Sequence, residues 1–380
     1  MSRVEPFTID VAQDVLDDLR DRLLRTRRPP TVRHDWERGT ASDALDRLLA
    51  HWSGPYDWRA AERRLNALEH VRVEVEGLGI HAVRAGTPGA TPLLLIHGWP
   101  DGVIRFERAL PLLADRFELV VPSIPGYGWS DIPAEPTGPA RVGDLLAGLM
   151  TALGHERFGV HGGDIGSTIG EQLAVRHPGR VLGLHLGDVP LHRPRTLAPG
   201  DRTPADDEWL ARLAAWDAPG GGSAYARLQR SRPQTLAVSL EDSPAGLAAW
   251  FLEKFHAWTD PDGDVFEHFS LDDLCTNLTV YWTTRTAGSS ADYYFDNAHS
   301  ELSTGRVAAP TAFAQFPRDI LPAPRESAER WFDVVRWTGF PRGGHFGPWE
   351  EPDLWAADVV AFFDAIDRSS QERFSKRAET

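Results

Sequence analysis

The stretch Gly162-Gly163-Asp164-Ile165-Gly166 decides the fold of this chain. It has the small-x-nucleophile-x-small pattern of a nucleophile elbow, with aspartate at the place where an esterase carries serine. Residues 157–161 before it are compatible with a short strand, and residues 165–176 after it predict a helix that ends at Pro178 and Gly179. A sharp turn from strand to helix crowds the backbone, so the neighbours of the nucleophile must be small.

The carboxylate at this turn indicates the type of chemistry. A carboxylate can displace a leaving group at a saturated carbon and remain on the enzyme as an alkyl ester. This points away from ester or peptide cleavage and toward opening a strained or activated C–O or C–halogen bond. The alternative is an ordinary Gly-rich turn with a capping aspartate, because Gly and Asp are common in turns. The motif by itself does not separate the two interpretations.

Length and composition narrow the class of protein. With 380 residues, 42% of them hydrophobic and 25% charged, the chain can bury a large core. A net charge of -15 without a basic stripe argues against nucleic acid as a partner. The single cysteine, Cys275, favours a reducing compartment, and the first residues lack the pattern of a signal peptide. No apolar run approaches membrane-spanning length. We therefore expect a cytoplasmic protein without a membrane partner.

Helical spacing of apolar residues marks the N-terminal part of the chain. Residues 11–25, 42–52 and 58–68 each predict an amphipathic helix. Residues 71–75 alternate apolar and polar side chains, and residues 80–83 follow after two glycines. These two segments predict a β-hairpin with one solvated face.

The middle of the chain predicts an α/β fold. Residues 93–96 and 119–121 are continuous apolar runs, as strands buried on both faces should be. Helical patterns alternate with such runs as far as Leu186. This alternation favours a mostly parallel sheet with flanking helices.

The pattern changes at about Leu191. Residues 191–301 are rich in Trp and Phe at helical spacing and contain no buried strand run, which predicts a helical lid inserted over the sheet. Strand patterns return at 311–314 and 334–337, and a closing helix is expected near 355–366. The chain thus divides into four parts. An N-terminal helical meander comprises residues 1–70, and a core in two parts comprises residues 71–190 and 302–367. A lid comprises residues 191–301, and a polar tail comprises residues 368–380.

A second motif, His97-Gly98-Trp99-Pro100, follows the buried strand at 93–96. A loop at that point can direct the backbone N–H of Trp99 toward Asp164. Together with the N–H of Ile165 it would form an oxyanion hole for the carbonyl of an ester intermediate. The alternative is that the glycine and proline only shape a turn.

A histidine and an acid complete the predicted constellation. His345 follows the last predicted strand and comes directly after Gly343 and Gly344, and hydrolases of this topology carry nucleophile, acid and histidine in that order. A histidine can accept a proton from water near neutral pH. Asp319, after the strand at 311–314, is the expected acid that orients it, and Asp188, after the run ending at Leu186, is the competing candidate.

Taken together, these motifs resemble the epoxide hydrolases of the α/β-hydrolase fold, in the branch with an N-terminal helical meander that includes microsomal and fungal enzymes. The resemblance covers nearly the whole chain. It rests on the motifs above and on others in the same order: Tyr56-Asp57-Trp58-Arg59, Ile124-Pro125-Gly126-Tyr127-Gly128, Arg232-Pro233-Gln234-Thr235, Glu253-Lys254-Phe255, Tyr281-Trp282-Thr283-Thr284 and Gly343-Gly344-His345-Phe346.

The resemblance implies two lid tyrosines that donate protons to the epoxide oxygen. They correspond to Tyr225 and to one residue of the Tyr293-Tyr294 doublet, where the spacing favours Tyr294. A phenol can donate at neutral pH without being ionised. The chain departs from the family at Ile165, which is often Trp, and at Asp101-Gly102, where Gly and Ser are usual. Neither metal nor organic cofactor is implied, and a homodimer is compatible with the family.

The sequence therefore predicts an epoxide hydrolase that forms a vicinal diol through an ester on Asp164, which water activated by His345 then hydrolyses. Aromatic residues of the lid suggest a bulky, aromatic or apolar epoxide as the small-molecule substrate, although more than half of them are expected to fill the lid core. These aromatic residues are Trp209, Trp216, Trp250, Phe251, Phe255 and Trp258. Two alternatives stay open: a haloalkane dehalogenase-like hydrolase, and a catalytically idle protein of this fold that only binds a ligand.

Overall fold

The computed structural model describes residues 3–30, 32–259 and 263–378. Its centre is a nine-stranded mixed sheet of the order β1-β2-β3-β5-β4-β6-β7-β8-β9. Strand β1 pairs with β2, β2 with β3, and β3 with β5, all antiparallel. The remaining neighbours in the sheet, from β5 through β4 to β9, pair in parallel. The strands are β1 Val4–Pro6, β2 Glu69–Val75, β3 Leu78–Gly86, β4 Thr91–Ile96, β5 Phe117–Pro122, β6 Phe158–Gly162, β7 Val181–Leu186, β8 Val307–Gln315 and β9 Phe332–Gly339.

The central strands are buried on both faces, as their continuous apolar runs predict. In β4, Leu93 and Leu95 pack into the cluster that contains Phe363, whereas Leu94 and Ile96 pack into the main core on the other face. All four leucine and isoleucine side chains of this strand are fully buried. The predicted hairpin is also confirmed as β2 and β3, while the short edge strand β1 was not anticipated.

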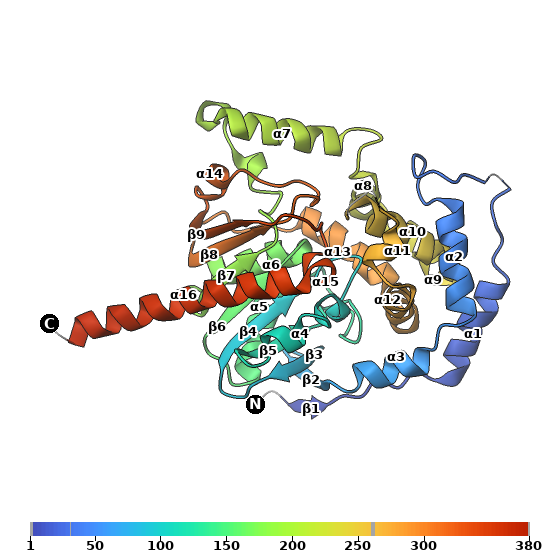
Figure 1. Cartoon of the computed structure of the whole chain (residues 1–380), viewed down its shortest axis with the longest axis horizontal. Helices are drawn as coiled ribbons and strands as arrows, with labels where there is room; N and C mark the ends of the chain where they lie inside the picture. The colour runs from blue at the N-terminus through green and yellow to red at the C-terminus, as the bar shows by residue number, and fades with distance from the viewer. Residues whose placement is uncertain (1–2, 31, 260–262, 379–380) are drawn as a thin grey trace.

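Helices cover both faces of the sheet (Figure 1). Helices α5 and α6 pack together on one face, and α16 lies across the other, against α4, β7 and β8. The predicted helix 165–176 is confirmed as α6. The closing helix is longer than expected, because it continues through the segment that was assigned to a polar tail. These helices are α4 Leu110–Leu113, α5 Pro139–Ala152, α6 Ile165–Arg176, α14 Arg325–Ala328, α15 Gly347–Glu350 and α16 Pro352–Ala378.

The chain between β7 and β8 is helical and lies over one end of the sheet (Figure 1), as the loss of strand patterns predicts. Most of these lid helices gather beside the N-terminal helices, whereas α7 extends along the outer edge of the molecule. The lid helices are α7 Pro204–Asp217, α8 Ala224–Ser231, α9 Pro233–Asp242, α10 Pro244–Ala257, α11 Val265–His268, α12 Leu271–Thr284 and α13 Ala287–His299.

The N-terminal helices pack against the outer side of the lid. They are α1 Gln13–Leu24, α2 Ser42–Ser53 and α3 Trp58–Leu65. Helices α1 and α2 contact α10 and α12 of the lid. The buried indole N–H of Trp52 in α2 donates to the hydroxyl of Thr279 in α12 at 2.9 Å. The meander is therefore part of the packing of the lid.

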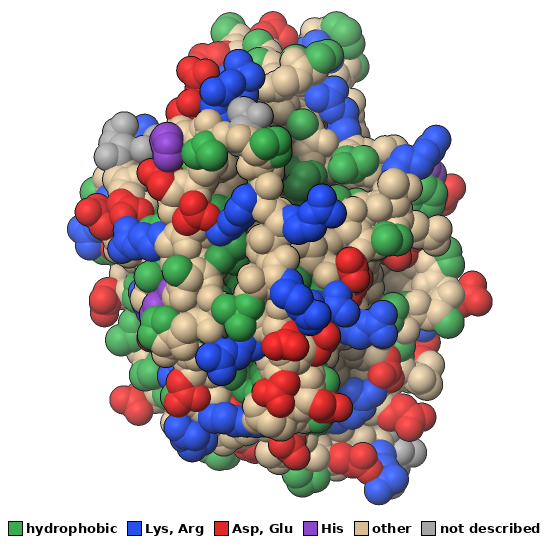
Figure 2. Space-filling view, turned by 90° about the vertical axis from the view of Figure 1, so that its right-hand side faces the viewer, with side chains coloured by type: hydrophobic (Ala, Val, Ile, Leu, Met, Phe, Trp, Pro, Cys, Tyr) green, Lys and Arg blue, Asp and Glu red, His purple; other side chains and the backbone are tan. Residues whose placement is uncertain are grey.

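The surface on this side carries Lys or Arg and Asp or Glu side chains next to one another (Figure 2). Some of them link the meander to the lid, as in the ion pair between Arg22 and Asp242 at 2.9 Å. Exposed pairs of this kind contribute little to stability. Among the described residues, no helix has both the length and the hydropathy needed to cross a bilayer.

A buried arginine ties both ends of the lid to the core. Arg193 is almost fully buried and pairs through Nε with Glu171 of α6. Its two terminal nitrogens donate to the carbonyl oxygens of Thr304 and Gly305, each at 2.8 Å. Burial raises the pKa of Glu171 to about 7, and the charge of Arg193 opposes this rise. The side chain of Arg193, in the segment that enters the lid, thus contacts both the segment that leaves the lid and helix α6.

We expect Arg193→Met to lower the free energy of unfolding by about 3–5 kcal/mol, because the buried carboxylate of Glu171 loses its cationic partner and two backbone carbonyls lose their donor. Urea unfolding followed by tryptophan fluorescence measures the change. Arg176→Met is the matched control, since Arg176 forms an exposed pair with Asp144 and its loss should cost less than about 1 kcal/mol. Equal destabilisation by the two substitutions would contradict the anchoring role of Arg193.

Candidate active site

Asp164 lies on the sharp turn between β6 and α6. Its backbone has φ 58° and ψ −128°, a conformation that non-glycine residues rarely adopt and that costs about 1–3 kcal/mol. The neighbouring glycines explain how the turn closes. A Cβ on Gly162 would lie 2.2 Å from the carbonyl oxygen of Gly166, and a Cβ on Gly166 would lie 2.5 Å from that of Ile96. The small-x-Asp-x-small pattern is therefore a steric requirement of this turn.

The loop after β4 directs a backbone donor at the carboxylate. The N–H of Trp99 donates to Oδ1 of Asp164 at 3.0 Å. Gly98 is required here as well, because a Cβ would lie 2.7 Å from the Cβ of Asp164. The backbone N–H of Ile165 also helps to lower the pKa of this carboxylate. The two N–H groups predicted to form an oxyanion hole thus both act on the same side chain.

His345 lies between two carboxylates. Its Nδ1 is 2.7 Å from Oδ1 of Asp319, in a hydrogen bond. Its Nε2 is 3.3 Å from Oδ2 of Asp164, within the distance of an ion pair but without hydrogen-bond alignment. The loops that carry His345 and Asp319 run side by side, since Arg318 and Gly344 form an isolated parallel bridge. The geometry brings together Asp164, His345 and Asp319.

The electrostatics of this group follow from burial and charge. Burial alone would lower the pKa of His345, but the charge of Asp319 and the contact with Asp164 raise it above its ordinary value. Burial alone would raise the pKa of Asp164, but His345 and the N–H groups of Ile165 and Trp99 hold it below its ordinary value. The resting site therefore contains an imidazolium beside an ionised carboxylate.

Asp188, the competing acid, has a different position. Its Oδ1 accepts from the backbone N–H of Asp164 at 2.8 Å and from the hydroxyl of Ser167 at 2.7 Å. Burial and the nearby charge of Asp319 raise the pKa of Asp188 to about 7. This residue holds the backbone of the elbow, and its carboxylate makes no hydrogen bond to His345.

Two tyrosines of the lid line the same cavity as Asp164. Tyr225 of α8 and Tyr294 of α13 lie with ring centroids 5.9 Å apart, and both pack on the indole of Trp99. Burial raises the pKa of both phenols well above the ordinary value, and the negative charge of Asp164 adds to this rise. Both hydroxyls are therefore protonated at neutral pH. The neighbouring Tyr293 lies outside the cavity described next.

One cavity of about 640 Å³ joins these residues. Asp164, Ile165, Asp188, Tyr225, Tyr294, Asp319 and His345 all line it. Of the lid aromatics expected around the substrate, only Trp216 does so. The others are in the lid packing: Trp209, Trp250, Phe251, Phe255 and Trp258. Part of the wall is charged instead, since it carries Arg195, Asp217, Arg227 and Arg230.

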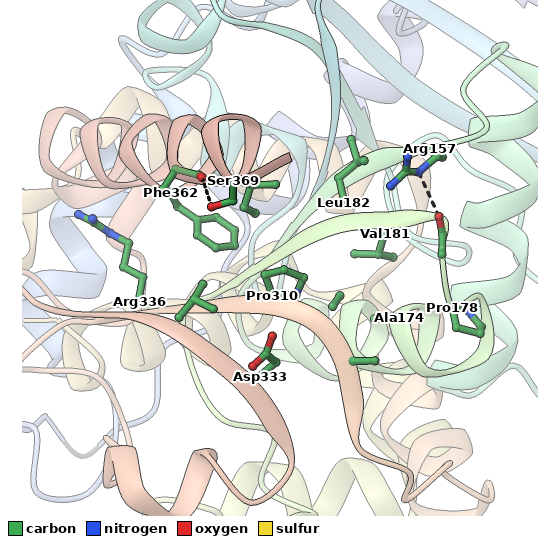
Figure 3. Close-up of a pocket in the computed structure, with 16 residues that line it drawn as sticks. Arg157, Ala174, Pro178, Val181, Leu182, Pro310, Asp333, Arg336, Phe362 and Ser369 are labelled. Carbon is green, nitrogen blue, oxygen red and sulfur yellow. Dashed lines mark hydrogen bonds between the residues drawn. The ribbon is translucent and has the colours of Figure 1, made fainter. Parts of the chain in front are cut away.

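A second cavity, of about 550 Å³, lies at the N-terminal ends of strands β7, β8 and β9 (Figure 3). It is bounded by the first residues of β7, β8 and β9 and by α16, with Arg157 and Asp333 among its polar groups. None of the predicted site residues lines it. In the described part of the chain, no cluster of His, Cys, Asp or Glu side chains is arranged to hold a metal ion.

Two supporting contacts were not predicted from the sequence. Asp101 accepts from the N–H of Gly98 at 2.9 Å and pairs with Arg105, whose other nitrogen donates to the carbonyl oxygen of His345 at 2.7 Å. Lys254 lies 4.7 Å from the centroid of the Tyr225 ring and is almost fully buried. Asp101 stood out only as a departure from a motif, and an Asp–Arg spacing of four residues is common on exposed helices.

Known proteins are similar to this chain over most of its length. A sequence profile described as "Epoxide hydrolase N terminus" matches residues 4–106, and one described as "alpha/beta hydrolase fold" matches residues 91–238. Epoxide hydrolase 1 of Oryctolagus cuniculus is 33% identical over 412 residues, covering 96% of this chain and 90% of the relative.

Two solved structures agree with this assignment. Juvenile hormone epoxide hydrolase of the silkworm Bombyx mori superposes with a TM-score of 0.85 at 28% sequence identity and covers 97% of this chain and 96% of its own. The epoxide hydrolase of Aspergillus niger superposes with a TM-score of 0.83 at 28% identity and covers 96% of this chain and 97% of its own. The chain therefore belongs to the epoxide hydrolases of the α/β-hydrolase fold, in the branch that carries an N-terminal helical meander.

Proposed function

We propose that this protein converts an epoxide to a vicinal diol through a covalent ester on Asp164. The observation that carries the proposal is the position of the Asp164 carboxylate. It lies between two backbone N–H donors and His345, and the hydroxyl-bearing rings of Tyr225 and Tyr294 line the same cavity. A cavity of about 640 Å³ has room for a bulky epoxide.

In the first step, Oδ2 of Asp164 attacks one carbon of the epoxide and the C–O bond of the ring breaks. Oδ2 is the oxygen suited to attack, because Oδ1 is held by the N–H of Trp99. The ring oxygen becomes an alkoxide and takes a proton from Tyr225 or Tyr294. The ammonium of Lys254 over the ring of Tyr225 favours the phenolate as it forms.

Ester formation prepares the second step. It removes the negative charge of Asp164, which is one of the two charges that raise the pKa of His345. The imidazolium can then release its Nε2 proton, which restores the phenol of the tyrosine that donated in the first step, and the neutral imidazole acts as a base toward water while Asp319 holds Nδ1 in the N–H form. Water attacks the ester carbonyl, the N–H groups of Trp99 and Ile165 stabilise the oxyanion, and the diol leaves with Asp164 regenerated.

Replacing the nucleophile tests the first step. We expect Asp164→Ala to lower kcat for styrene oxide at least about 10³-fold, because no carboxylate remains to form the ester. Diol formation is measured by chromatography. Asp115→Ala, which changes an exposed carboxylate outside the site, should keep wild-type activity. Wild-type turnover by the Asp164 variant would exclude the covalent route.

Replacing the base tests the second step. In His345→Gln the ester should form but hydrolyse slowly, so the intact protein should gain the mass of one epoxide molecule. Mass spectrometry of the quenched reaction measures this adduct, and peptide mapping should place it on Asp164. The double variant Asp164→Ala/His345→Gln is the control and should gain no mass. An adduct on another residue would contradict the assignment of the nucleophile.

The tyrosine doublet provides a matched pair of variants. We expect Tyr225→Phe and Tyr294→Phe each to lower kcat about 10²-fold, because each removes one donor to the epoxide oxygen. Tyr293→Phe should change kcat less than a few-fold, since Tyr293 is buried but does not line the cavity. Steady-state kinetics with styrene oxide measures all three. A larger loss in Tyr293→Phe than in Tyr294→Phe would reverse the assignment.

A further inference from the structure

The wall of the active-site cavity contains arginines for which the proposed chemistry has no use. Arg227 and Arg230 both lie on α8, the helix that carries Tyr225, and both line the cavity. They are three residues apart, so they are neighbours on the helix surface, where two like charges destabilise a helix unless a counterion lies nearby. Both side chains are partly shielded from solvent.

Arg230 has unused hydrogen-bond donors. Its Nε donates to the carbonyl oxygen of Ala226 within its own helix at 3.2 Å. Its two terminal nitrogens make no hydrogen bond, and no carboxylate lies within 4.0 Å of them among residues 3–30, 32–259 and 263–369. Arg227 is partly engaged, since one terminal nitrogen donates to the carbonyl oxygen of Ala218 at 2.9 Å. It too lacks an acidic partner among these residues.

The other cationic groups of the cavity have acidic partners. Arg195 pairs with Asp217, and His345 contacts both Asp164 and Asp319. His192 adds no charge at neutral pH, because burial and two neighbouring arginines lower its pKa to about 4. The uncompensated positive charge of the wall is therefore concentrated on α8.

We propose that the cavity binds epoxides that carry an anionic group, and that Arg230, with Arg227 beside it, binds that group while the epoxide lies at Asp164. This rests on the proposed epoxide hydrolysis and narrows its substrate class to epoxides with a carboxylate at some distance from the ring. A guanidinium with free terminal nitrogens matches the geometry of a carboxylate. Binding the remote end of the substrate in this way orients the epoxide for attack.

Two features make the arrangement notable. The chain as a whole carries a net charge of -15, which repels anions at long range, so a local cationic wall works against the global field. Arg230 also acts on the catalytic group. Burial raises the pKa of Tyr225, and the charge of Arg230 opposes that rise. Arg230 is thus close enough to Tyr225 for the bound anion and the reacting epoxide to occupy one cavity.

The other interpretation of Arg230 is structural. A basic residue in the last turn of a helix interacts favourably with the C-terminal carbonyls, and Arg230 has this position in α8. A purely structural arginine would affect charged and neutral substrates alike. The ratio of kcat/KM for a charged and a neutral substrate of the same shape therefore separates the two interpretations.

The experiment uses terminal epoxides on saturated chains of increasing length, each prepared as the carboxylate and as the primary carboxamide. For the wild type at low ionic strength we expect an optimum chain length at which the carboxylate is preferred about tenfold or more over the amide. Added salt should reduce this preference. In Arg230→Gln the ratio should fall about tenfold, and Arg230→Lys should retain part of it.

Arg232→Gln is the matched control, because Arg232 follows the same helix but does not line the cavity. Its carboxylate-to-amide ratio should equal that of the wild type. Turnover of the amides without preference for the carboxylates, or an unchanged ratio in Arg230→Gln, would overturn the inference and leave the proposed epoxide hydrolysis intact. Turnover of neither series, nor of styrene oxide, would overturn both.

Discussion

The backbone conformation of Asp164 is the constraint on which the site depends. A positive φ at a residue with a side chain is tolerated only because β6 and α6 on either side are buried in the core and the flanking glycines leave room for the turn. The same turn places the carboxylate of Asp164 beside backbone N–H groups, and it orients the N–H of Asp164 so that it donates to the carboxylate of Asp188. A strain of about 1–3 kcal/mol is small beside the burial of a whole strand and helix.

A second constraint is electrostatic. Asp164, Asp188 and Asp319 lie around one imidazole, and three carboxylates this close cannot all be ionised without cost. The pKa of Asp188 rises to about 7, through burial and the charge of Asp319, whereas that of Asp164 falls. The environment thus separates a carboxylate that stays ionised for attack from one that takes up a proton at little cost. This division of roles depends on which carboxylate contacts His345.

The parts of the fold that repeat a local pattern could be predicted from the sequence. The buried strands, the hairpin and helix α6 follow from runs, alternation and spacing of apolar residues. Asp319 was preferred to Asp188 on chain order and not on a local pattern. In the structure its contact with His345 depends on the bridge between Arg318 and Gly344, which are far apart in the chain. The choice of Tyr294 over Tyr293 depends on which face of α13 meets the cavity.

The features that escaped prediction are buried polar contacts between distant segments. Arg193 with Glu171, and Arg105 with the carbonyl of His345, leave no periodic signature, since a single arginine in a sequence is normally a surface residue. The continuation of α16 was missed for a related reason. Its last turns are polar, and this polarity was interpreted as the end of the helix, whereas α16 continues to Ala378.

The composition of the lid does not show which of its aromatic residues line the cavity and which fill the core. Most of these rings fill the interface between α10, the N-terminal helices and the core, which leaves α8 to face the substrate. Because α8 carries Tyr225 together with Arg227 and Arg230, one short helix brings a phenol and two cations to the same cavity. Under the function proposed above, substrate choice depends less on how many aromatic residues the lid contains than on which face of α8 lines the cavity.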